Sequence, residues 1–260
     1  MFRTSELLTI LEEYAPLEIS KKAIQKGDYD NSGLLVKTNQ NASKILFSLD
    51  LSVEAVKRAE EVGADTIVTH HPAIYNPIKS IDIDGENKAL ILAIKKGLSI
   101  ISMHLNLDMA KMGIDYYLAK GLGAAEDIIL DDLDGVHGYG RQFKVGKDAE
   151  EFLNSAEKEL GTDKILFYGN GIVECCASFC GGGSSHALNM VKEGKTDADL
   201  IVSSDMPHHI LQELIEGGKK VMIIPHYVSE NYGFNKFYEW ALERLDKKAL
   251  LYYFEDKRFM

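Results

Sequence analysis

The sequence is poor in several features, and each shortage excludes a class of protein. Only three cysteines occur among 260 residues, so a fold held together by a disulfide framework is excluded. No apolar run reaches the length of a membrane-spanning helix. Basic residues are outnumbered by acidic ones, 29 to 40, which leaves a formal net charge of −11. So acidic a surface repels phosphate backbones and argues against a nucleic-acid partner.

The N-terminus and the cysteines narrow the class further. Segment 1–14 mixes acids into its apolar pattern, which is typical of an amphipathic helix rather than a secretion signal. We therefore expect a cytoplasmic protein with no membrane segment. Cys175, Cys176 and Cys180 share one apolar stretch without C-x-x-C spacing. They are expected to be buried strand cysteines, and the alternative is a reactive thiol or a soft-metal site.

What the sequence does contain is an alternation of strand and helix patterns. Strands are expected at 44–49, 65–70, 99–104, 165–169, 171–180, 199–204, 220–225 and 250–255. Helices are expected at 52–62, 86–96, 109–120, 148–160, 186–191, 207–216 and 231–245. Such alternation predicts an α/β fold with mixed sheets. A boundary is placed near residue 130, giving an N-terminal half (1–130) and a C-terminal half (131–260) that face each other across a cleft.

The two halves show a weak internal sequence similarity, called the echo below. Segment 65–74 resembles 199–210, since each is an apolar strand that runs toward a His-His pair. Segment 99–108 resembles 221–230, since each is an apolar strand followed by His, three residues and an acid. Either the halves are related by duplication, or strands that end in polar residues produce the echo by chance.

Histidines cluster where strands are expected to end, and six of the eight lie at or just past such an end. Ligand sites of open α/β sheets form beyond the carboxyl ends of strands. The segments concerned are His70-His71, His104 with Asp108, and His226 with Glu230. The last two are i, i+4 pairs, which a helical turn would place on one side. Imidazole and carboxylate ligands suit Zn, Mn, Fe, Co or Ni. A single such histidine would more often be a hydrogen-bonded core residue, but three converging segments favour a metal site.

Five motifs in order resemble one family, the Nif-three-like dinuclear metal-binding proteins, often labelled type-two GTP cyclohydrolase I homologues. The motifs are DNSGLLV (30–36), THHPAIY (69–75), MHLNLD (103–108), SSDMPHH (203–209) and PHYVSE (225–230). The chain departs from the family pattern at Tyr29, Leu105, Ser204 and Pro225. None of these positions is a proposed ligand, so the departures affect the pocket lining and the inherited substrate specificity.

The resemblance implies a ligand set and an assembly. His70, His71, Asp108 and His226 match metal ligands, and Glu230 matches a carboxylate that bridges two ions. His104 matches a histidine close to the metals, either a ligand or a group beside one. The family context implies two divalent ions per chain, a ring-shaped homohexamer, and the short form without an inserted domain.

Further residues carry two interpretations each. Asp205, His208 and His209 are candidate catalytic groups that transfer protons, or only a helix start with Asp205 as N-cap before Pro207. The loop 181–184 could cradle an anion, but a tight strand-to-helix turn is the simpler interpretation. Asp50 either lies near the site or caps the following helix.

The favoured function is dinuclear metal-dependent hydrolysis of a nucleotide-like or other small phosphorylated or cyclic-amide substrate. The family label suggests GTP cyclohydrolase-like ring opening. The alternative is a protein without catalysis, either one that binds or handles metal or an interaction scaffold.

Overall fold

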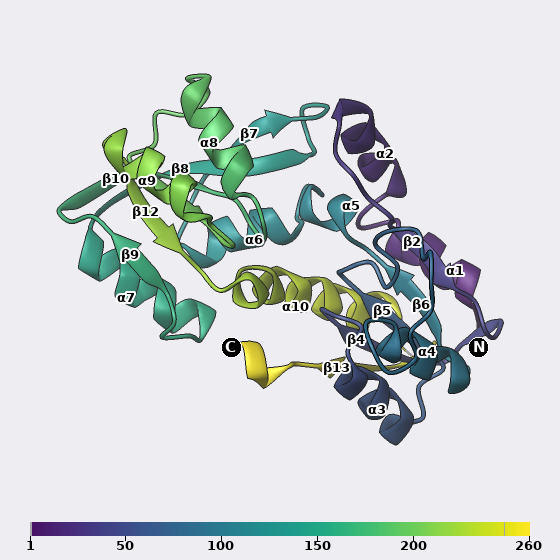
Figure 1. The fold of residues 1–260 in the computed structure, drawn as a ribbon. Coiled ribbons are helices and arrows are strands. Elements are labelled where there is room, and N and C mark those ends of the chain that lie inside the picture. The colour runs from purple at the N-terminus through teal and green to yellow at the C-terminus, as the bar shows by residue number, and fades with distance from the viewer. Residues whose placement is uncertain (1, 247) are drawn as a thin grey trace. The chain divides into compact units, whose positions relative to one another are not determined.

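The computed structural model describes residues 2–246 and 248–260, so Met1 of the expected N-terminal helix lies outside it. The chain forms two compact units (Figure 1). The first contains the chain up to Leu107 together with Phe234–Asp256, and the second contains Asp108–Gly233 and Lys257–Met260. The boundary expected near residue 130 instead falls in a strand of the second unit, β7 (Ile128–Asp132). No helix in the described part of the chain is long and apolar enough to cross a membrane.

A five-stranded sheet in the order β13-β4-β5-β6-β2 forms the centre of the first unit. Its strands are β2 (Gly33–Val36), β4 (Lys44–Ser48), β5 (Thr66–Thr69), β6 (Ser99–Ser102) and β13 (Leu250–Phe254). Only β2 runs antiparallel to its neighbour. All residues of β5 and β6 are buried, as continuous apolar strands of a parallel sheet should be.

Helices of the first unit begin and end where the sequence provides caps. α3 (Val53–Val62) starts after Ser52, whose hydroxyl accepts a hydrogen bond from Ala55 N at 3.0 Å. It ends at Gly63, which has a left-handed φ of 66°. The remaining elements of this unit are α1 (Thr4–Leu11), α2 (Leu17–Lys26), α4 (Lys88–Lys95) and the pair β1 (Phe2–Arg3) and β3 (Asn41–Ala42).

The second unit contains a six-stranded sheet in the order β7-β8-β10-β11-β12-β9. Besides β7, its strands are β8 (Gly138–Asp148), β9 (Leu166–Tyr168), β10 (Ile172–Ser178), β11 (Leu200–Ser203) and β12 (Lys220–Ile223). Its helices are α6 (Ile114–Gly121), α7 (Ala149–Leu160), α8 (Ser184–Lys192) and α9 (His208–Glu216), followed by a 3-10 turn, η1 (Lys257–Phe259). A buried cluster that includes Phe179, Ile201 and Leu214 forms its core.

Both sheets contain the same arrangement of four strands. In the first, β4, β5 and β6 are parallel neighbours in chain order, and β2 pairs antiparallel with β6. In the second, β10, β11 and β12 are parallel neighbours in chain order, and β9 pairs antiparallel with β12. β5 therefore corresponds to β11 and β6 to β12, which is the correspondence that the internal sequence echo predicts. The shared topology supports duplication over chance.

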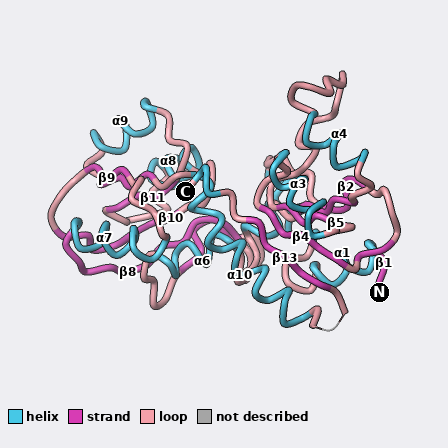
Figure 2. The backbone as a smooth tube through the Cα atoms, turned by 90° about the horizontal axis from the view of Figure 1, so that it is seen from below, coloured by secondary structure: helices cyan, strands magenta, loops and turns pink. Residues whose placement is uncertain are grey.

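Two helices differ from the sequence-based expectation. The helix expected at 231–245 begins earlier, as α10 (His226–Arg244), directly after Pro225. The helix expected at 109–120 begins later, as α6, because Gly113 is extended, with ψ of −169°, and is the N-cap. A separate short helix, α5 (Leu105–Asp108), precedes it. Figure 2 shows the alternation of strands and helices within each unit.

Candidate metal centre

Three histidines of the first unit follow two neighbouring parallel strands. His70 and His71 come directly after β5, and His104 comes two residues after β6. His70 is fully buried, and its Nδ1 donates to Met103 O at 2.8 Å. Ligand atoms of His70 lie within 4.8 Å of those of His71 and also of those of His104. The first unit thus brings together three imidazoles that the sequence spreads over 35 residues.

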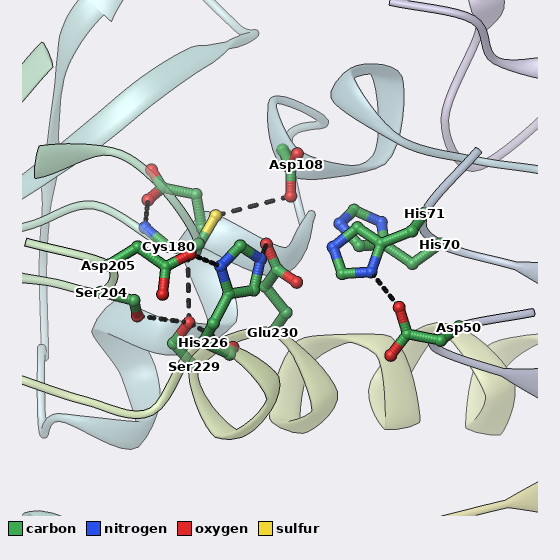
Figure 3. A network of polar contacts seen from close by, with 12 residues as sticks. Asp50, His70, His71, Asp108, Cys180, Ser204, Asp205, His226, Ser229 and Glu230 are labelled. Atoms are coloured by element: carbon green, nitrogen blue, oxygen red, sulfur yellow. Dashed lines mark hydrogen bonds and ion pairs between the residues drawn. The ribbon is translucent and has the colours of Figure 1, made fainter. Parts of the chain in front are cut away.

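Carboxylates fix the orientation of the other two rings. His71 Nδ1 donates to Asp50 Oδ1 at 2.6 Å (Figure 3), so Asp50 lies beside the site rather than capping α3. His104 Nδ1 donates to Asp30 Oδ1 at 2.8 Å. Burial alone would raise the pKa of Asp30, but hydrogen bonds, chiefly from His104, hold it at about 2. In each neutral ring the proton therefore sits on Nδ1, and Nε2 presents its lone pair as a metal ligand would.

The second unit contributes a histidine and a glutamate from the first turns of α10. His226 and Glu230 lie one turn apart, with Nε2 and Oε1 separated by 3.0 Å. His226 Nδ1 donates to Asp205 Oδ2 at 2.5 Å. Asp205 has a φ of 42°, and among the described residues it is the one non-glycine with a positive φ. Such a conformation costs roughly 1–3 kcal/mol and persists where the surroundings enforce it.

Glu230 is held against the loop that follows β10. Its side chain is almost completely buried, and a Cβ built on Gly181 would lie only 2.1 Å from Glu230 Oε1. Gly181 N donates to Ser229 Oγ at 3.1 Å, which fastens this loop to α10. Gly181 has a φ of 57°, and Gly183 is packed against Tyr139 and Phe179. The loop 181–184 is thus a tight strand-to-helix turn that makes room for a carboxylate.

Asp108 lies at the end of α5 in a buried group of acids. Cys180 Sγ donates to Asp108 Oδ1 at 3.5 Å (Figure 3). Burial raises the pKa of Cys180 well above the usual range, and the charges of Asp108, Asp115 and Glu230 raise it further. Arg141 is the buried cation of this group, with Nε 3.3 Å from Asp115 Oδ2. Burial raises the pKa of Asp115 to about 7, although the charge of Arg141 lowers it.

The remaining candidates have mixed outcomes. Cys176 and Cys180 are buried as expected, and Cys175 is partly buried. The interpretation of Asp205 as a helix N-cap is wrong, because α9 is capped by Pro207 and the Asp205 carboxylate bonds His226. His208 and His209 are exposed in the first turn of α9. Their proton-transfer role, like that of Asp205, stays a prediction.

The donor set fits divalent metal ions. Buried histidine, aspartate and glutamate side chains of the described residues could hold a metal ion. Four imidazoles have Nδ1 engaged by an oxygen acceptor, which is the usual arrangement around metal-binding histidines. Sequence reasoning had missed Asp30 and Cys180 as partners of the proposed ligands. Asp30 stands in a quoted motif, so its position was visible although its role was not.

The fold and these clusters define a class, that of two-unit α/β proteins with clusters of histidines and carboxylates that could hold a metal ion. The family model of Duf34/NIF3 (NGG1p interacting factor 3) matches residues 2–255, and the chain belongs to this family.

Relatives agree with this assignment. A Clostridium perfringens protein named GTP cyclohydrolase 1 type 2 homolog is 31% identical over 94% of this chain and 93% of its own length. A Methanocaldococcus jannaschii protein of the same name is 29% identical over 95% and 98%. Among solved structures, reduced HcgD from M. jannaschii has a TM-score of 0.80 at 27% identity and covers 98% of both chains. A Bacillus cereus protein related to NIF3 has a TM-score of 0.86 at 17% identity, covering 98% and 97%, and shows the fold alone.

Proposed function

We propose that the protein binds two divalent metal ions and uses them to hydrolyse a small substrate. The proposed ligands are the residues that the family resemblance implies, namely His70, His71, His104, Asp108, His226 and Glu230. The observation that carries the proposal is the shared orientation of four histidines, each of which presents Nε2 while Nδ1 donates to an oxygen. A histidine that serves only in packing does not need this fixed tautomer.

The negative charge around the ligands favours two ions over one. Asp108 and Glu230 are at most 5% exposed. Further carboxylates, Asp30, Asp50 and Asp205, accept from the imidazoles. Asp30 is buried as well, whereas Asp50 and Asp205 are partly exposed to solvent, so one divalent ion would leave part of the buried charge uncompensated, which is costly. A bridging role for Glu230 is what the family resemblance implies, and a carboxylate between two cations would offset their repulsion.

Bound divalent ions supply Lewis acidity and lower the pKa of water, the chemistry that many dinuclear hydrolases use. Other side chains of the protein hold the metal-ligating histidines in position. Asp30, Asp50 and Asp205 fix the imidazole tautomers and keep each ring from rotating. His208 and His209 are the exposed imidazoles proposed to move protons near neutral pH. Ring opening of a GTP-like substrate is the specific reaction that the relatives' names suggest.

The test compares two substitutions in the same helix. Glu230→Gln keeps the volume of the buried side chain but removes its charge, so we expect loss of at least one of two metal equivalents per chain. Glu239→Gln is the matched control, because Glu239 is exposed on α10 and pairs with Lys236 at 3.0 Å. Metal content by elemental analysis, circular dichroism and a hydrolase screen with Mn, Fe or Zn are measured for each protein.

Each outcome separates the proposal from its rival. A folded Glu230→Gln protein that keeps two metals overturns the assigned ligand role. A wild-type protein that binds two metals but hydrolyses nothing in the screen favours the metal-binding protein without catalysis. Light scattering on the same samples tests the homohexamer that we propose from the family resemblance.

A further inference from the structure

A cavity of about 870 Å³ lies beside the histidine cluster of the first unit. Most of its lining comes from the loop between β5 and α4, which Figure 2 draws in pink next to α4. The first lining residue is Pro72, which directly follows His71. Its size lies within the usual range of small-molecule sites, roughly 300–1,000 Å³. None of the proposed metal ligands lines it. We propose that this cavity binds a nitrogen heterocycle that carries a phosphate, by stacking the ring on Tyr75.

The start of the loop is held rigidly. Tyr29 OH donates to Tyr75 O at 2.6 Å, and Asn31 Nδ2 donates to Ile74 O at 2.5 Å. Ala73 N donates to Ser102 Oγ at 3.2 Å, which ties the same segment to β6. A wall fixed by three separate hydrogen bonds is preorganised, so little ordering free energy is spent when a ligand binds.

Tyr75 connects the cavity with the histidines. Its ring is 46% exposed and lines the cavity. The ring centroid lies 5.0 Å from that of Tyr29 and 6.1 Å from that of His104, at interplanar angles of 66° and 87°. Both neighbours meet Tyr75 edge-on, so they brace the ring. Exposed aromatic rings of fixed orientation are the platforms on which bases stack.

The rest of the lining selects the ligand class. Ile74, Ile78 and Leu90 supply apolar walls. The Glu86 carboxylate and the Asn76 amide also line the cavity, and their oxygens can accept hydrogen bonds from the N–H groups of a nitrogen heterocycle. Lys79 also lines the cavity and forms no ion pair with any residue that the structure describes. On a chain with a net charge of −11, such an ammonium group is a local site for an anion.

These observations point to a nucleoside phosphate with its base on Tyr75 and its phosphate at Lys79. The inference rests on the proposed hydrolytic function only in naming this ligand as the substrate. Binding itself belongs to the first unit and needs no metal. The two ideas can therefore fail separately.

The experiment is calorimetric titration of the full chain with GMP, guanosine and ribose 5-phosphate, after chelation of metal and again after reconstitution with Mn. Loss of one base–aromatic stacking contact costs about fivefold in affinity or more. We therefore expect Tyr75→Ala to weaken GMP and guanosine by at least this factor, and Tyr75→Phe to bind both normally. Lys79→Ala should weaken GMP and leave guanosine unchanged.

Ile81→Ala is the matched control, because Ile81 is 63% exposed on the same loop and does not line the cavity. It should bind every probe as the wild type does. Wild-type affinity of folded Tyr75→Ala for GMP overturns the proposal, as does ribose 5-phosphate binding as tightly as GMP. Tyr75-dependent binding in a Glu230→Gln protein that has lost metal supports the cavity whatever the outcome for hydrolysis.

Discussion

Gly181 offers a way to disturb Glu230 without removing any proposed ligand. A methyl group added there would lie 2.1 Å from Glu230 Oε1 and 3.5 Å from His226 Nε2. Ordinary van der Waals contact begins near 3.4 Å, so the Glu230 carboxylate must move by more than an ångström. Such a displacement breaks the geometry of a metal ligand, because coordination distances tolerate only about 0.2 Å.

Gly181→Ala should also lower stability through the backbone. Its φ of 57° is left-handed, and an L residue pays about 1–2 kcal/mol for that conformation. For a chain of this size each kcal/mol lowers Tm by about 2–4 °C. The backbone cost alone therefore predicts a fall of about 2–8 °C.

The control for this prediction is Gly146→Ala. Gly146 belongs to the same unit, has a φ of 69°, and has nothing within 4 Å of the added Cβ. In calorimetry of the metal-free protein, Gly146→Ala should lose only the backbone part of the stability, and Gly181→Ala should lose at least as much, because its Cβ also displaces Glu230. Elemental analysis should show reduced metal content only for Gly181→Ala. Equal and undiminished metal content in the two variants would refute the assigned role of Glu230.

Two further predictions concern buried titratable groups of the second unit. The pKa of Asp115 rises from an ordinary value of 3.8 to about 7 in the folded chain, so folding between these pH values takes up a proton at this carboxyl group. The free energy of unfolding should therefore fall as pH rises from about 4 to about 7. Asp115→Asn should flatten that slope in denaturant titrations at a series of pH values, and an unchanged slope would count against it. Cys176 and Cys180 are buried with a raised pKa, so iodoacetamide at neutral pH should modify them only after unfolding. Mass spectrometry of alkylated native protein checks this, and rapid labelling of either thiol would contradict it.

Much of the fold could be predicted because its information is local. The fully buried strands β5 and β6 appear in the sequence as short apolar runs, and Ser52 and Gly63 mark the ends of α3. Hydrophobic period and capping are properties of neighbouring residues, so one sequence suffices to find them.

The division into units could not be predicted in this way, because it depends on pairing between distant segments. β13 lies at the end of the chain but pairs with β4, with Leu250 opposite Lys44. A linear boundary near residue 130 assigns the two strands to different halves. No local pattern records which of several apolar strands becomes the neighbour of another.

The start of α10 was misplaced for a related reason. The pattern from His226 to Glu230 contains two side chains chosen for the site rather than for an amphipathic stripe. These polar site residues interrupt the apolar helical pattern in the first turns of α10, so the start of the helix could not be recognised from hydrophobic periodicity. The pairing of His226 with Glu230 was nevertheless predictable, since that spacing is itself helical.

Two of the acids that orient the histidines, Asp50 and Asp205, occupy positions that the strand pairing explains. Asp50 comes two residues after β4, and His71 comes two residues after β5, where Ser48 and Thr69 are partners in the parallel register. The second unit repeats the device, because Asp205 and His226 follow the paired ends Ser203 and Ile223 of β11 and β12. Neighbouring strands lie about 4.8 Å apart, so an acid and a histidine just past paired ends can share a hydrogen bond. The acid after one strand and the histidine after its parallel neighbour thus form one functional pair. The order of the strands in the sheet brings the two residues together although they are distant in the sequence.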